Sequence, residues 1–202
     1  GVIEKLWSFK GSLEEGKIIA TDGQAGYQEN ILRGGLHFWY WRWQYAIHKC
    51  PLVTIKQGKI AYVFARDGQP LESGQTLGRT VECNDYQDPK AFLTKNGQKG
   101  RQRGILREGV YAINPALFNV IAEDYVYHHD ADSDELESWQ KTLLNISGFS
   151  PVIISGADDQ IGIVTCHDAP ALAPGEIIAP AVGVDKDDEN FHNNFQDIEA
   201  FL

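Results

Sequence analysis

The chain has 202 residues, 43% of them hydrophobic, so it can bury the core of one large domain or two small ones. Its 28 acidic and 18 basic residues give a formal net charge of −10, which disfavours contact with a nucleic-acid backbone. Cys50, Cys83 and Cys166 form no CxxC pair, so we expect reduced core thiols and neither a zinc site nor a disulfide framework. No run approaches the roughly 20 apolar residues of a spanning helix.

The first unusual stretch is residues 35–51, GLHFWYWRWQYAIHKCP, which holds three of the five tryptophans. As a strand it places these tryptophans on one face and Phe38 and Tyr40 on the other. Both faces are apolar, so one is expected to pack on a core and the other to meet lipid or a partner. Tryptophan and tyrosine are typical of the lipid headgroup level, so a membrane-facing strand and a purely internal strand both remain open. The candidate membrane-contact residues are Leu36, Phe38, Trp39, Tyr40, Trp41 and Trp43.

Further elements follow from local composition. Runs rich in β-branched residues predict strands at residues 60–65 and 161–166, each ended by turn residues. Residues 88–97 predict a short helix, because Asp88 is a good N-cap, Pro89 suits the first helical position and Gly97 follows the end.

The segment KNGQKGRQRGILR concentrates positive charge within an acidic chain. It lacks the Gly-Lys-Ser/Thr ending of a phosphate-binding loop. A solvated loop and a contact with lipid headgroups or a second subunit both remain open. The basic residues concerned are Lys95, Lys99, Arg101, Arg103 and Arg107.

The segment HHDADSDELE invites a metal-site interpretation, because Asp130, Asp132 and Asp134 have the alternate spacing of an EF-hand loop. However, Glu135 replaces the required glycine and Lys141 stands where the bidentate glutamate belongs. A charged helix start is therefore favoured, and we predict neither a metal nor a cofactor.

This second helix is expected to continue to a stop at Gly148. Its apolar residues recur at helical spacing, which predicts one buried face. They are Leu136, Trp139, Leu143 and Leu144.

The sequence repeats itself. Residues 58–81 are echoed by residues 159–182 at one constant spacing, which pairs Asp67 with Asp168, and YQDPKAFL at residues 86–93 matches FQDIEAFL at residues 195–202. A fainter copy lies in residues 13–47, where the aromatic stretch takes the place of a return strand. We therefore expect tandem units, and a natural chain that continues beyond Leu202.

These motifs resemble a known family. GLHFWYWRWQYAIHKCPLVTI is similar to the Gly-(Leu or Pro)-His-Phe signature and following strand of the stomatin, prohibitin, flotillin and HflK/C family (SPFH, band 7). DGQAGYQ, GKIAYVFARDGQPLESGQTLGR and NGQKGRQRGILREGVYAINPALF are similar to pieces of bacterial flotillin-like members. The resemblance covers residues 16–118 and resumes over residues 160–202.

The resemblance implies a β-rich α+β fold with tandem SPFH-like units of antiparallel strands and short helices. We expect a membrane-proximal segment at residues 1–15 and one partial and one complete unit at residues 16–126. An inserted helix or linker is expected at residues 127–151, and the start of a further, truncated unit at residues 152–202.

The resemblance also implies a function. It is that of a membrane-associated scaffold, on the cytoplasmic face of the cell membrane, that forms large homo-oligomers and organises microdomains. The implied partners are the lipid bilayer, further copies of the chain and client proteins, and not nucleic acid. No GxSxG or HExxH motif occurs, so we expect no enzyme. The alternatives are a soluble adaptor that docks a protein through its aromatic strand, and a hydrolase built on acids gathered in space.

Overall fold

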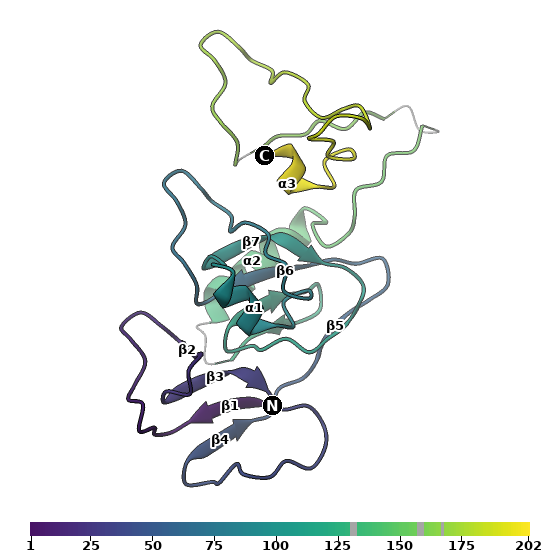
Figure 1. Cartoon of the computed structure of the whole chain (residues 1–202). Coiled ribbons are helices and arrows are strands. Elements are labelled where there is room, and N and C mark those ends of the chain that lie inside the picture. The colour runs from purple at the N-terminus through teal and green to yellow at the C-terminus, as the bar shows by residue number, and fades with distance from the viewer. Residues whose placement is uncertain (130–132, 157–159, 167) are drawn as a thin grey trace.

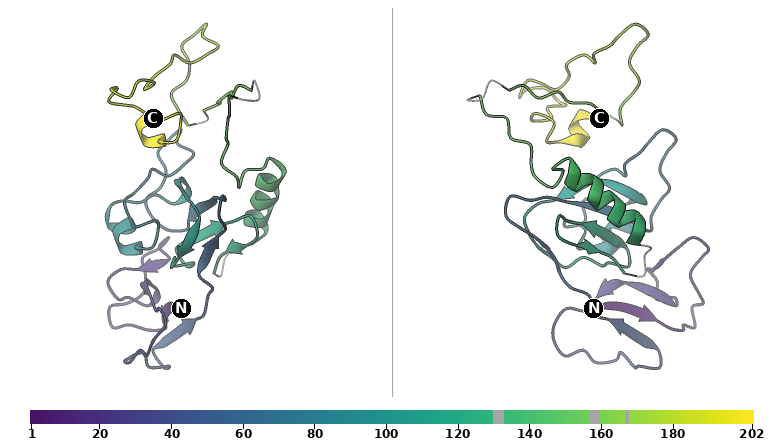
Figure 2. Two further views of the ribbon diagram at one scale, coloured as in Figure 1. Left: turned by 90° about the vertical axis from the view of Figure 1, so that its right-hand side faces the viewer. Right: turned by 180° about the vertical axis from the view of Figure 1, so that it is seen from behind.

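The computed structural model describes residues 1–129, 133–156, 160–166 and 168–202. The fold is β-rich, with mainly antiparallel sheets and short helices. The sheets follow one another along one axis, from the N-terminal sheet to the C-terminal segment at the far end (Figures 1 and 2). The strands are β1 Val2–Lys5, β2 Ile19–Ala20, β3 Gly26–Ile31, β4 Tyr45–His48, β5 Val53–Ile55, β6 Ala61–Ala65, β7 Gly100–Leu106, β8 Gly109–Tyr111, β9 Phe118–Ile121 and β10 Val126–Tyr127. The helices are α1 Pro89–Thr94, α2 Ser133–Asn145 and α3 Ile198–Phe201.

Unit 1, residues 2–48, is a four-stranded sheet with the order β2-β3-β1-β4. Its central strand β1 pairs antiparallel with β3 on one side and β4 on the other, and Val2 and Ile3 are buried. Residues 1–15, which we expect to be a separate membrane-proximal segment, thus supply the strand that organises unit 1.

Unit 2, residues 53–127, contains a four-stranded sheet with the order β10-β9-β6-β7, beside the pair β5-β8. The predicted strand at residues 60–65 is confirmed as β6, whose residues alternate between buried and half-buried. The predicted helix is confirmed as α1, and Asp88 Oδ1 accepts a hydrogen bond from Ala91 N at 2.9 Å. Phe92 of this helix packs edge-on against Phe118 of β9, with 4.9 Å between ring centroids, and closes the core.

Units 1 and 2 share the same architecture. Each central strand, β1 or β6, pairs with two antiparallel neighbours, and its register with the first neighbour shifts at the same place. The parallel pairing of Ala20 with Gln28 has a counterpart in the bridge between Gly78 and Gln102. The side chains of Gln28 and Gln102 also donate to corresponding pairs of backbone carbonyls. The fainter copy that the sequence analysis places at residues 13–47 is therefore a repeat of unit 2 in three dimensions.

Helix α2 packs against the four-stranded sheet of unit 2, with Leu136 buried in a cluster with Ile121, Val126 and Phe149. Asp134 and Glu135 lie in its first turn, where acidic side chains interact favourably with the helix dipole. The predicted helix is confirmed, but Leu144 is exposed and does not belong to its buried face.

The C-terminal segment, residues 160–202, repeats one local structure of unit 2. Asn193, Asn194 and Phe195 have positive φ angles, as do Asn84, Asp85 and Tyr86 before α1. Asp197 then caps α3 by accepting from Ala200 N, as Asp88 caps α1.

The strand predicted at residues 161–166 is wrong. Ile161 and Ile163 are exposed, and none of the described residues pairs with this segment as a strand. A β-branched run needs a neighbouring strand to hold its backbone hydrogen bonds, and this one has none. Cys166, which lies in it, is exposed and is not the core thiol that we expect from the sequence.

A buried carboxylate joins unit 2 to unit 1. Asp67, just after β6, accepts hydrogen bonds from Ile18 N at 2.7 Å and Ile19 N at 2.9 Å, and Lys17 Nζ lies 3.8 Å from it. At the next junction its repeat partner Asp168 accepts from Thr76 N at 2.9 Å. Thr76 occupies the place of Ile18 in the repeat, so both junctions use the same contact.

Replacing Asp67 with Ala should destabilise the junction by about 3 kcal/mol, because hydrogen bonds to a charged group contribute about 1.5–3 kcal/mol each. Urea unfolding should show this loss, and the amides of Ile18 and Ile19 should exchange faster with deuterium. The exposed Asp22→Ala is the control, with an effect within about 0.5 kcal/mol. Unchanged exchange at Ile18 and Ile19 would contradict the role of Asp67.

The burial of Glu29 predicts an unusual pH dependence of the stability of the fold. Burial raises its pKa, and Lys90, 3.8 Å away, offsets this only in part. A raised pKa in the folded state means that the charge destabilises the fold above the ordinary glutamate pKa of 4.5. We expect Glu29→Gln to be more stable than the wild type at neutral pH, and to lose this advantage as the pH falls from the raised pKa of Glu29 to 4.5. Thermal unfolding across pH checks this, with the exposed Glu15→Gln as control; a less stable Glu29→Gln at neutral pH would contradict it.

Candidate functional site

The aromatic stretch forms the loop between β3 and β4, and the prediction of a strand there is wrong for residues 35–44. Trp39 has φ +75°, which a strand does not accommodate, and a turn follows in which Gln44 N and Tyr45 N donate to Trp41 O at 2.9 and 2.8 Å. Only the end of the stretch forms a strand, β4, which takes the place of β9 in the repeat.

The large apolar side chains of this loop face solvent. Leu36 is 89% exposed and Trp39 81%. The candidate contact residues Leu36, Phe38, Trp39, Tyr40, Trp41 and Trp43 are all classed as exposed. The loop lies at the end of the molecule opposite the C-terminal segment (Figures 1 and 2). A cluster of this kind marks an interface.

A second loop extends the cluster. Trp7, in the connection from β1 to β2, stacks on Trp43 with 5.2 Å between ring centroids and donates from Nε1 to Trp43 O at 3.3 Å. Phe9 packs edge-on against Trp7 and is 97% exposed, and Leu6 is also exposed. We call these two loops together the aromatic surface. The sequence interpretation missed Leu6, Trp7 and Phe9, although the apolar run LWSF directly after the first strand was a signal.

The repeat shows what this position does in unit 2. The counterpart of the β3–β4 loop is the connection from β7 to β9, in which Gly109 at the start of β8 matches Gly35, and both glycines have positive φ. The β8–β9 loop at the end of this connection matches the end of the aromatic stretch, because Leu117 N and Phe118 N donate to Asn114 O as Gln44 N and Tyr45 N donate to Trp41 O. In unit 2 this loop is buried against unit 1, where Asn114 Nδ2 donates to Gln28 O at 3.0 Å and Glu29 O at 3.2 Å. The aromatic surface thus occupies a docking position, and no residue that the structure describes covers it.

The basic segment at residues 95–107 is not one surface. Its residues 100–106 form strand β7 and are not a loop. The Arg101 guanidinium lies 3.4 Å from the Trp139 ring centroid, and Lys95 Nζ donates to Glu82 O at 2.6 Å. Arg103 is mostly buried and forms ion pairs with Asp168 and Glu199. Lys99 and Arg107 are exposed.

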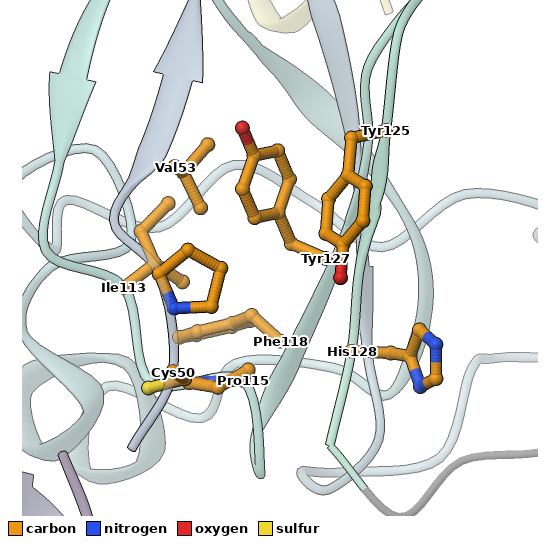
Figure 3. Close-up of a pocket in the computed structure, with 9 residues that line it drawn as sticks. Cys50, Val53, Ile113, Pro115, Phe118, Tyr125, Tyr127 and His128 are labelled. Atoms are coloured by element: carbon orange, nitrogen blue, oxygen red, sulfur yellow. The ribbon is translucent and has the colours of Figure 1, made fainter.

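An apolar cavity lies between β5 and the β9–β10 hairpin (Figure 3). Phe118 and Tyr127 contribute to its lining, together with the half-buried Cys50. Its volume of about 20 Å³ has room for about one water molecule. Small-molecule sites of proteins measure roughly 300–1,000 Å³, so this cavity is too small for such a ligand.

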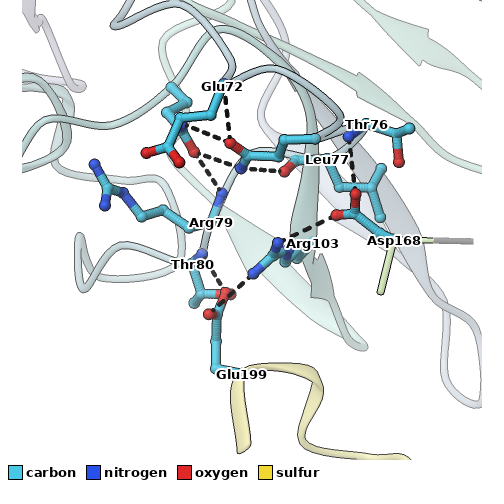
Figure 4. Close-up of polar contacts among 10 residues, drawn as sticks. Glu72, Thr76, Leu77, Arg79, Thr80, Arg103, Asp168 and Glu199 are labelled. Atoms are coloured by element: carbon cyan, nitrogen blue, oxygen red, sulfur yellow. Dashed lines mark hydrogen bonds and ion pairs between the residues drawn. The ribbon is translucent and has the colours of Figure 1, made fainter. Parts of the chain in front are cut away.

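A larger polar groove of about 460 Å³ separates the β6–β7 connection from the C-terminal segment. Figure 4 shows Arg103 reaching Asp168 at 3.1 Å and Glu199 at 3.2 Å, while Thr80 N donates to Glu199 at 2.7 Å. Burial opposes the charge of Asp168, but Thr76 N–H and the Arg103 guanidinium lower the pKa of Asp168 below its usual value. Ion pairs and charge-assisted hydrogen bonds therefore hold the C-terminal segment against unit 2 at this groove.

The structure bears on only part of the metal-site hypothesis, because Asp130 and Asp132 lie outside the described residues. Asp134 belongs to the first turn of α2. Among the residues that the structure describes, no group of three or more His, Cys, Asp and Glu side chains is placed to hold a metal ion.

Comparison with other proteins adds no relative: no family model, no curated protein and no solved structure matches the chain. In the described ranges, no helix is both long enough and apolar enough to cross a membrane.

Arg103→Ala should release the C-terminal segment. Charge-assisted hydrogen bonds contribute about 1.5–3 kcal/mol, so limited proteolysis within residues 168–202 should become at least about tenfold faster. The control is Arg79→Ala at the same groove, because Arg79 is exposed and its side chain makes no ion pair with the described residues. Equal cleavage of both variants would show that Arg103 does not hold the segment.

Proposed function

We propose that the protein is a membrane-associated scaffold of the flotillin type, which contacts the bilayer through the aromatic surface. The observation that carries the proposal is the exposure of Trp39, Trp41 and Trp43 beside Trp7 at one end of the molecule. Indole and phenol rings partition to the headgroup level, where an apolar ring and a polar tip both find partners. The sequence resemblance to the SPFH family, which implies tandem β-rich units, also supports the proposal.

The proposal includes self-association into a large homo-oligomer that organises lipids and client proteins at the cytoplasmic face of the cell membrane. Edge strands support it: β2 and β4 are the outer strands of one sheet, and β7 and β10 of another. Edge strands present unpaired backbone groups that a neighbouring copy can use. This function requires no chemistry, and we propose no enzymatic activity.

Replacing Trp39, Trp41 and Trp43 with Ser should reduce flotation with liposomes at least about a hundredfold, because burial of each large apolar side chain contributes roughly 1.5–3 kcal/mol. Circular dichroism should be unchanged, since all three side chains are exposed in the folded chain. The control replaces Ile177 and Ile178, which are even more exposed and lie in the C-terminal segment, with Ser. Flotation that survives in the tryptophan variant would reject the proposal.

A soluble adaptor is the second candidate, and one observation favours it. The β8–β9 loop, which matches the end of the aromatic stretch, docks on protein and not on lipid. Binding of a purified protein partner without lipid, lost in the tryptophan variant, would support the adaptor.

A further inference from the structure

The charge beside the aromatic surface is opposite to that of the whole chain. No Asp or Glu occurs between Glu29 and Asp67, although the net charge of the protein is −10. The basic residues of this interval are Arg33, Arg42, Lys49, Lys56, Lys59 and Arg66.

Some of these cations are used within the fold, and others are available. Lys56 and Lys59 pair with Asp124 and Glu123 at 2.7 Å each. Arg33 and Arg42 are exposed and form no ion pair among the described residues, and Lys10 in the neighbouring loop is exposed as well.

Lys49 is likewise exposed and unpaired among the described residues, but it follows β4. The other three available cations, Lys10, Arg33 and Arg42, belong to the aromatic loops themselves. Arg42 stands between two exposed tryptophans, and Lys10 follows Phe9. The His37 ring lies 2.7 Å from Arg33 O, which fixes the start of the β3–β4 loop.

Most acids of unit 1 are engaged or lie elsewhere. Glu29 is buried beside Lys90, whereas Asp22 is exposed and adjoins Gly23, whose carbonyl oxygen accepts from Ser8 Oγ of the β1–β2 loop at 2.8 Å. Glu4 is paired with His48 at 2.7 Å. Glu14 and Glu15 belong to the far half of the β1–β2 loop, where Leu13 covers Gly26 and Lys17 reaches Asp67 of unit 2. The aromatic surface therefore combines apolar rings with net positive charge, because Lys10, Arg33 and Arg42 outnumber the one exposed acid, Asp22, that adjoins it.

We infer that the aromatic surface binds anionic phospholipids, with Lys10, Arg33 and Arg42 contacting headgroup phosphates while the rings enter the interface. This inference rests on the proposed membrane contact. The three cations stand on the two exposed loops that carry the aromatic rings, and they lie outside both cavities. Basic residues beside an anionic leaflet strengthen binding roughly fivefold each.

The test measures the partition of the full chain onto two kinds of vesicle: phosphatidylcholine alone, and phosphatidylcholine mixed with phosphatidylglycerol. The wild type should prefer the anionic vesicles, and the preference should fall as salt is added. The double variant Arg33→Gln, Arg42→Gln should lose roughly 25-fold in affinity for the anionic vesicles and little for the neutral ones. The control is Lys99→Gln, Arg107→Gln, which removes the same charge from exposed positions of unit 2 and should behave as wild type.

The outcomes separate the two proposals. If the wild type binds both vesicles equally, or if the control loses as much affinity as the double variant, the anionic preference is overturned while the membrane contact stands. If the wild type binds neither vesicle, the membrane contact itself fails, and this inference fails with it.

Discussion

The arrangement of the molecule depends on one buried carboxylate. Asp67 is 2% exposed, and a charge in such a place is tolerated only when hydrogen-bond donors surround it. Ile18 N–H and Ile19 N–H are such donors, and they are fixed to the backbone of unit 1, so unit 2 has one orientation in which the carboxylate is satisfied. In that orientation the β8–β9 loop falls on β3, and the aromatic surface is left at the end of unit 1 away from unit 2.

One difference between the two junctions is the sign of the charges in an equivalent pair of residues. At the first junction Lys90 of α1 approaches Glu29 of β3, whereas at the second Glu199 of α3 bonds Arg103 of β7. Glu29 and Arg103 occupy equivalent places in the repeat, and so do Lys90 and Glu199. The acidic and the basic partner are therefore exchanged between the two sides of the junction. An exchange of this kind opposes pairing in the wrong order, because Glu199 against Glu29, or Lys90 against Arg103, would bring like charges together. The pairs thus contribute to the specificity of each junction as well as to its stability.

Local signals allowed part of this fold to be predicted. The α1 helix follows from Asp88 and Pro89, which act within a single turn, and the repeat is visible because it needs only comparison along the chain. The aromatic stretch was assigned to a strand because its composition suits one, but Trp39 with positive φ and the turn at Trp41 depend on how the loop closes between β3 and β4. Residues 161–166 fail for a related reason, since a strand requires a partner that composition does not reveal. The contact of Trp7 with Trp43 joins positions too distant in sequence for any local pattern to predict.

The repeat also bears on what the aromatic surface meets. In unit 2 the docking loop buries aliphatic side chains and uses Asn114 to reach two carbonyl groups, a geometry matched to one strand edge. In unit 1 the same position carries tryptophans and a tyrosine, with Arg42 among them. A protein partner is bound by hydrogen-bond donors at fixed positions. A lipid interface is bound instead by aromatic rings with a polar tip and by cations on long side chains, because the depth of insertion and the charge determine the affinity there. A repeated docking position with this change of composition therefore favours lipid over a second protein as the surface that covers it.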